Sequence, residues 1–194
     1  MKKCEKNSKR LLTQIEDAVA YMAGLKKKIP VIDASAKTIV SALKNGGKIL
    51  TAGNGGSAAE ALHMAEELTG RFRTNRRSLP GLALVADPTA LTCIGNDFGF
   101  DSIFSRQIEG LGRKGDVLVL FSTSGKAANL VLALEAAKKR RMKVICLLGR
   151  DGGALAGRGD HEIIVAGTVT ERIQEVHQVI LHLFLDAVEN NFIG

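Results

Sequence analysis

The first 45 residues have the hydrophobic periodicity of two helices. A lysine-rich turn at 26–28 and Pro30 separate two stretches in which apolar side chains recur every three or four residues. The apolar positions are Leu11, Leu12, Ile15, Val19 and Met22, then Ile32, Ala36, Ile39, Val40 and Leu43. Asn45-Gly46-Gly47 is typical of a helix C-terminus. We therefore predict two helices between residue 7 and about residue 45.

Beyond residue 47 the pattern changes to short apolar runs, bounded by Gly, Asp or Ser, that alternate with helical stretches. The runs predict strands at 48–52, 81–85, 116–121, 143–148 and 161–165. Continuous hydrophobicity indicates strands buried on both faces, as in a parallel sheet covered by helices. Helices are expected near 57–70, 102–111, 126–141 and 170–191. We predict one α/β domain over residues 1–194, a doubly wound five-stranded parallel sheet with an N-terminal helical segment at about 1–46.

The N-terminal helices and the last helix carry more apolar surface than one small sheet would cover. Packing between subunits would bury this surface, so we expect a homo-oligomer with these helices at the interface. Part of the surface is explained if the helices cover their own sheet.

Composition narrows the functional classes. The chain is 45% hydrophobic and 24% charged, and no apolar run approaches the roughly 18 residues of a membrane helix. No apolar stretch follows the basic segment Met1–Arg10, as a signal peptide would require. The three cysteines lack metal-site spacing and predict reduced thiols in a cytoplasmic protein, with Cys93 and Cys146 in the core. We expect no membrane partner.

The net charge of +7 suits an anionic partner. Basic residues gather at 26–28, 71–77 and 138–141, but aromatic residues make up only 4% of the chain and do not alternate with them. A stacking platform for nucleic-acid bases is therefore not expected. We interpret most of these charges as solvated helix ends, with one group near an anionic substrate.

Two glycine- and hydroxyl-rich loops follow predicted strands and precede helices. The first is Gly53-Asn54-Gly55-Gly56-Ser57, where the glycines allow close backbone approach and Ser57 can cap the helix or bind an anion. Taken alone, such a loop is at least as consistent with a purely structural turn as with a ligand-binding site. The second is Ser122-Thr123-Ser124-Gly125, whose three hydroxyls need hydrogen-bond partners at the end of a buried strand. A phosphate would supply them, and ligands of open α/β sheets bind at this edge, so we predict a phosphorylated small molecule.

Two helices carry acid–base and metal-binding candidates. His63 and Glu67 are four residues apart and so share one helix face, where they can bind a metal or transfer a proton. Exposed pairs of this kind are also common without a function. The last helix places Gln174, Gln178 and His182 in one stripe, although Gln174 and His182 are two turns apart.

Several segments together resemble the phosphoheptose isomerases, which are SIS-domain proteins. The resemblance covers nearly the whole chain and rests on five motifs: Gly53–Ser57, His63 with Glu66-Glu67-Leu68-Thr69-Gly70-Arg71, Gly95–Phe100, Ser122–Gly125, and Arg172-Ile173-Gln174-Glu175 with His182. It implies a SIS-type fold and a cytoplasmic homotetramer with one zinc ion per subunit. By resemblance the zinc ligands are His63, Glu67, Gln174 and His182. The substrate contacts implied are Asn54, Gly55, Gly56, Ser57, Glu67, Asn96, Asp97, Ser122, Thr123, Ser124 and Gln174.

The reaction implied is the interconversion of sedoheptulose 7-phosphate and D-glycero-D-manno-heptose 7-phosphate, toward the heptose of lipopolysaccharide or related glycans. Moving the carbonyl from C2 to C1 through an enediol requires proton transfer, for which the resemblance implies Glu67 as base and His182 as partner acid/base. Zinc would polarise the carbonyl. A zinc-bound carboxylate is a poorer base, so the two roles of Glu67 compete.

The chain departs from the family pattern at two positions, and three other functions are alternatives to the isomerase function. Lys126-Ala127 stands where the family commonly has Asn-Ser, so Lys126 either contacts the phosphate or is solvated. Glu171 stands where some members carry aspartate. The alternatives are a non-enzymatic SIS protein that binds the replication initiator, a sugar-phosphate-sensing regulatory domain, and an isomerase of another sugar phosphate.

Overall fold

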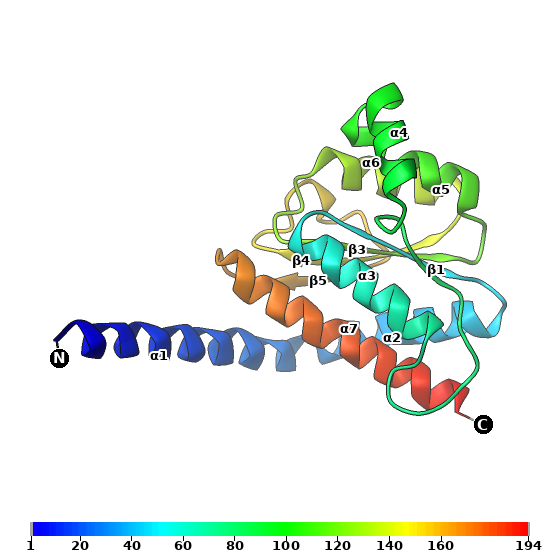
Figure 1. The fold of residues 1–194 in the computed structure, drawn as a ribbon. Coiled ribbons are helices and arrows are strands. Elements are labelled where there is room, and N and C mark those ends of the chain that lie inside the picture. Colours follow the sequence, from blue (N-terminus) through cyan, green and yellow to red (C-terminus); the bar gives the residue numbers. More distant parts are fainter. Residues whose placement is uncertain (1, 194) are drawn as a thin grey trace.

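The computed structural model describes residues 2–193, with side chains from residue 7 onward, and contains one five-stranded parallel sheet. The strand order is β2-β1-β3-β4-β5, and every neighbouring pair is parallel. The strands are β1 (Ile49–Gly53), β2 (Gly81–Ala83), β3 (Val117–Ser122), β4 (Lys143–Gly149) and β5 (His161–Val165). The α-helices are α1 (Lys2–Ala23), α2 (Ile29–Lys44), α3 (Gly56–Thr69), α4 (Pro88–Phe98), α5 (Ser105–Leu111), α6 (Ala128–Lys139) and α7 (Thr170–Phe192). The predicted fold class is confirmed (Figure 1).

Alternate residues of the strands form two separate cores, one on each face of the sheet. Val117, Val119 and Phe121 of β3 pack with α2, α3 and α7 on one face. Leu118 and Leu120 pack with α5 and α6 on the other face. Every residue of β3 is buried, which explains why its sequence is continuously apolar rather than alternating.

Helix α4 was not predicted, and its environment explains the omission. None of its residues is buried, and it packs against the body only through partly buried side chains such as Leu91 and Ile94. Its start is fixed locally, because Pro88 occupies the first turn and the Asp87 carboxylate accepts hydrogen bonds from the N–H groups of Thr89 and Ala90. The helix predicted at 102–111 begins only at Ser105, after a 3-10 turn, and the strand predicted at 81–85 ends at Ala83.

The two described cysteines have different environments. Cys146 is buried in β4 as predicted, and burial raises the pKa of its thiol to about 12. The prediction that Cys93 is a core residue was wrong. Its neighbours Leu91 and Ile94 pack against the body, whereas Cys93 lies on the exposed face of α4. The side chain of Cys4 lies outside the described residues.

The N-terminal segment forms the two predicted helices, but only the second packs along its length. Helix α1 extends from the body as a single helix (Figure 1). A 3-10 turn, Gly24–Lys28, connects it to α2, which ends at Asn45 as predicted, with φ +79° at Gly46. Within residues 2–193, no helix is both long and apolar enough to span a membrane.

Candidate active site

The two predicted loops lie side by side at the point where the strand order reverses. Strands β1 and β3 are neighbours, with Gly53 paired with Phe121, and each is followed by a helix on the opposite face from the other's. Such a switch point is where open α/β sheets bind ligands. The amides of Asn54 and Asn129 join the loops through two reciprocal hydrogen bonds of 2.9 and 3.0 Å.

The first loop places Ser57 inside α3 rather than before it. Gly55, with φ +58°, is the N-cap residue and no side chain caps the helix. Of the two roles considered for Ser57, capping is therefore excluded, and anion binding by its buried hydroxyl stays a prediction. A β-carbon at Gly56 would lie 2.3 Å from the amide nitrogen of Gln174, so a side chain there would displace that amide. The side chain of Gln174 thus lies at the start of α3.

The second loop contains one hydroxyl that shapes the loop and two that are less enclosed. Buried Ser122 accepts a hydrogen bond of 2.9 Å from the N–H of Gly125, whose φ of +62° closes the turn. Thr123 and Ser124 are half-buried, and Ser124 Oγ accepts a 3.3 Å bond from the N–H of Lys126. Helix α6 begins without a side-chain cap, so its first turn faces the loop uncapped. This arrangement suits a phosphate.

The imidazole–carboxylate pair lies two turns further along α3, against α7. His63 Nε2 is 3.2 Å from Glu67 Oε1, and both side chains are partly buried. The ring of His182, from α7, meets the His63 ring edge-on with centroids 5.2 Å apart. Phe72 stacks on the His182 ring, with the ring centroids 5.6 Å apart. Burial and the proximity of His63 lower the pKa of His182, against the opposing charge of Glu67.

The structure brings together three of the four residues predicted to bind metal. His63, Glu67 and His182 are neighbours, and Glu66 adds a carboxylate so that ligand atoms of His63, Glu66 and Glu67 all lie within 4.8 Å of one another. Gln174 lies instead beside Gly56, and the amide found between the two histidines belongs to Gln178.

Asn96 and Asp97 are not joined to this cluster. Both are exposed on α4, and among the described residues their side-chain hydrogen bonds stay within that helix. Their predicted contact with the sugar remains a prediction.

The donor atoms of the cluster fit a divalent metal ion in part. Zinc binds imidazole nitrogen and carboxylate oxygen at about 2.0–2.2 Å, so two such atoms on one tetrahedral ion lie roughly 3.3 Å apart. The 3.2 Å between His63 Nε2 and Glu67 Oε1 matches this separation. His182 is placed alongside as a further donor.

Sequence reasoning missed three polar residues that shape the site. Asn129 ties the two loops together, Gln178 contacts both histidines, and Arg76 donates hydrogen bonds to the carbonyls of Glu67 and Leu68 at 2.6 and 3.0 Å. Gln178 was within the polar stripe of the last helix and Arg76 within the basic group at 71–77, but no local pattern singles out Asn129.

Comparisons with known proteins show the family to which the chain belongs. The SIS domain model matches residues 13–149. The phosphoheptose isomerase of Vibrio cholerae is 48% identical over 179 residues, which is 92% of this chain and 93% of that protein. This chain belongs to the phosphoheptose isomerase family of SIS-domain proteins.

Solved structures of family members also match nearly the whole chain. The phosphoheptose isomerase of Neisseria gonorrhoeae has a TM-score of 0.89 and 41% identity, covering 94% of this chain and 98% of that chain. A phosphoheptose isomerase from Francisella tularensis has a TM-score of 0.87 and 36% identity, covering 98% and 100%. The SIS domain match includes both loops, His63 and Glu67 but ends before α7, whereas the match to the Vibrio cholerae enzyme covers 92% of the chain and so reaches into α7.

Proposed function

We propose that this chain, a sugar-phosphate isomerase by family, interconverts sedoheptulose 7-phosphate and D-glycero-D-manno-heptose 7-phosphate in the cytoplasm. The product would supply the heptose of lipopolysaccharide or related glycans. The observation that carries the proposal is the placement of two phosphate-type loops at the switch point, beside an imidazole–carboxylate cluster on α3 and α7.

The spacing along α3 suits a long, linear substrate. Ser57 and His63 are six residues apart, which corresponds to about 9 Å of helix rise. With its phosphate held by Ser57 and the hydroxyls of the second loop, an open seven-carbon chain is long enough to bring its carbonyl end to His63 and Glu67.

Glu67 is the proposed base, and its two carboxylate oxygens have different surroundings. Oε1 faces His63, whereas Oε2 has no hydrogen-bond partner among the described residues. Oε2 can therefore take the proton from C1 while Oε1 keeps its contact, which eases the competition between the two roles of Glu67. The lowered pKa of His182 favours a neutral imidazole near neutral pH, able to take or return a proton at the substrate oxygens.

Zinc is the proposed cofactor, one ion per subunit. His63, Glu67 and His182 would hold it. Gln174, the fourth ligand that the resemblance implies, lies beside Gly56 in this structure and would have to move to join them. When bound, it would polarise the substrate carbonyl and stabilise negative charge on the enediolate oxygens.

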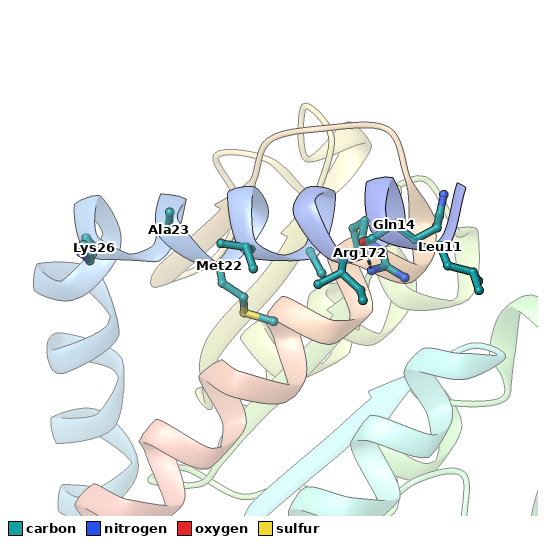
Figure 2. A pocket seen from close by; sticks show the side chains of 9 residues that line it. Leu11, Gln14, Met22, Ala23, Lys26 and Arg172 are labelled. Atoms are coloured by element: carbon teal, nitrogen blue, oxygen red, sulfur yellow. Dashed lines mark hydrogen bonds between the residues drawn. The ribbon is translucent and has the colours of Figure 1, made fainter. Parts of the chain in front are cut away.

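We further propose that the enzyme is a homotetramer in which α1 lies at a subunit interface. An apolar groove of about 830 Å³ runs along α1 and reaches Arg172 at the start of α7 (Figure 2). Ile15 and Val19, which line it, are 62% and 64% exposed. A second copy of the chain would bury this surface.

The test is isomerisation of sedoheptulose 7-phosphate by the purified protein, with and without chelator and added zinc. We expect zinc-dependent turnover that Glu67→Gln and His182→Ala abolish. His161→Ala is the matched control, because His161 lies at the opposite end of the sheet, at the start of β5, and contacts Thr38. Turnover of a different sugar phosphate alone would contradict the assigned substrate, and no turnover by the folded protein would contradict the reaction.

A further inference from the structure

The amide of Gln178 connects the two histidines of the site. Its Nε2 lies 2.6 Å from His63 Nδ1 and 3.3 Å from His182 Nε2, and its side chain is half-buried on α7. His63 therefore has a partner at each ring nitrogen, with Glu67 at Nε2 and Gln178 at Nδ1. This leaves the His63 ring held from both sides.

We propose that Gln178 is a positioning residue that fixes the orientation and tautomer of His63, an inference that rests on the proposed function of this site. A metal-binding imidazole uses one ring nitrogen for the ion and needs a hydrogen-bond partner at the other, which sets the tautomer and the ring plane. His63 Nε2 is 3.2 Å from Glu67 Oε1, the separation of two atoms that bind the same metal ion, so Nε2 is the nitrogen that would bind the ion. Nδ1 is then the nitrogen that needs a hydrogen-bond partner.

The hydrogen bonds select one arrangement in the metal-free protein. A neutral imidazole carries one proton, and Glu67 Oε1 accepts a bond best from a protonated Nε2. Nδ1 is then an acceptor, and the NH2 group of Gln178 donates to it. The second hydrogen of the same NH2 group points to His182 Nε2, so one amide orients both rings.

An amide suits this position because it can donate a hydrogen bond to Nδ1 of metal-free His63 and accept one from Nδ1–H of metal-bound His63. When Nε2 gives up its proton to bind a metal, the proton of the ring resides on Nδ1, and the amide oxygen can accept from it. A leucine could do neither, and a glutamate could only accept. Gln174 cannot replace Gln178 in this role, because its side chain lies one turn away against Gly56.

The first experiment reads the His63 tautomer in the metal-free full-length protein. Ring nitrogen NMR of histidine-labelled protein would be recorded, with the four histidines assigned through single His→Gln variants. We expect His63 to carry its proton on Nε2 in the wild type, to shift toward Nδ1–H in Gln178→Glu, and to populate both tautomers in Gln178→Leu. Asn190→Leu, an amide-to-leucine change on the same helix at an exposed residue that contacts Asp186, should leave the His63 tautomer unchanged.

The second experiment measures zinc affinity by competition with a chromophoric chelator. We expect Gln178→Leu to weaken zinc binding about 10- to 100-fold, as loss of an outer hydrogen-bond partner does elsewhere. Gln178→Glu should bind zinc close to the wild type, since the carboxylate accepts from Nδ1–H.

The two readouts separate failure of this inference from failure of the proposed function. A His63 tautomer that is the same in the wild type, Gln178→Leu and Gln178→Glu overturns the inference, whatever the protein binds. A wild type that binds no zinc but shows the expected tautomer shifts contradicts the proposed cofactor and leaves the positioning of His63 by Gln178 supported.

Discussion

At the scale of single residues, the site depends on side chains that never touch the substrate in the proposed mechanism. Arg76 is the clearest example. Its guanidinium donates to the carbonyls of Glu67 and Leu68 in the last turn of α3, where helix carbonyls have no partner within the helix. Burial lowers the pKa of Arg76, opposed by the charges of Glu189 and Glu67, but an arginine stays protonated in either case. Arg76 thus fixes the turn that carries Glu67.

We predict that Arg76→Leu lowers both activity and stability. Loss of hydrogen bonds from a charged donor to two partly buried carbonyls should cost about 1–2 kcal/mol of unfolding free energy. A frayed last turn of α3 should also reduce kcat, because Glu67 would lose its alignment. Urea unfolding and steady-state kinetics would check both effects. Arg77→Leu is the control, since the Arg77 guanidinium lies over the Phe192 ring instead; equal losses in the two variants would contradict the role given to Arg76.

The two serines of the second loop should have different roles, one structural and one in phosphate binding. Ser122 is buried and accepts from Gly125, so Ser122→Ala should lower the unfolding free energy by about 1 kcal/mol. Ser124 is half-buried with one long bond, so Ser124→Ala should raise KM for the sugar phosphate and leave thermal stability unchanged. A KM that stays constant in Ser124→Ala would remove this hydroxyl from the proposed phosphate site.

At the scale of elements, the segment between α3 and β2 is held against α7 by one buried carboxylate. Glu189 accepts hydrogen bonds from the N–H groups of Arg73 and Thr74 at 2.9 and 3.0 Å. Burial alone would raise the pKa of Glu189, but these N–H donors and the charge of Arg76 hold the pKa below its ordinary value of 4.5. The same segment carries Phe72, which stacks on His182, so its docking matters for the site.

The lowered pKa of Glu189 predicts an acid-sensitive contribution to stability. The folded state binds the proton more weakly than the unfolded state, so the stabilisation is complete above about pH 5 and is lost as pH falls through the lowered pKa. The difference in unfolding free energy between wild type and Glu189→Gln should therefore be constant from pH 5 to 7 and shrink below pH 4.5. Asp186→Asn, which removes the exposed partner of Arg73, should have a smaller effect; a difference that does not change with pH would contradict the prediction.

The elements that sequence could predict are those with a strong physical signal. Strand β3 is recognisable because burial on both faces demands continuous apolar residues. The loop after it is recognisable because three hydroxyl residues directly follow the apolar run. Helix α4 has a weaker signal: its apolar residues Leu91, Ile94 and Phe98 are spaced as in a helix, but the segment is short, contains Gly95 and has no buried residue. The pairing of Asn54 with Asn129, and of His63 with Gln178, joins residues 75 and 115 positions apart. No local pattern contains these contacts, so only the packing of α3, α6 and α7 reveals them.

At the scale of the whole molecule, α1 has a shape that a lone subunit does not explain. It extends from the body, and Leu11, Ile15 and Val19 remain 52%, 62% and 64% exposed in the described structure (Figure 1). Its attachment is partly polar, with Arg172 donating to the carbonyl of Gln14 at 3.0 Å. A helix with an uncovered apolar stripe normally packs against another element. The arrangement therefore favours a second copy as the missing cover.

We predict that the double variant Ile15→Glu, Val19→Glu dissociates the assembly, because burying two carboxylates against an apolar partner surface is strongly unfavourable. Light scattering coupled to size exclusion should give four times the 20.7 kDa chain mass for the wild type and a smaller assembly or monomer for the variant. Leu132→Glu, at a 36% exposed leucine of α6, is the control and should keep the wild-type mass. Circular dichroism would show whether the variant subunit still folds, as expected from two cores that lie entirely outside this stripe. A folded variant with the wild-type mass would mean that α1 is not the interface, and the exposed stripe would then need another partner.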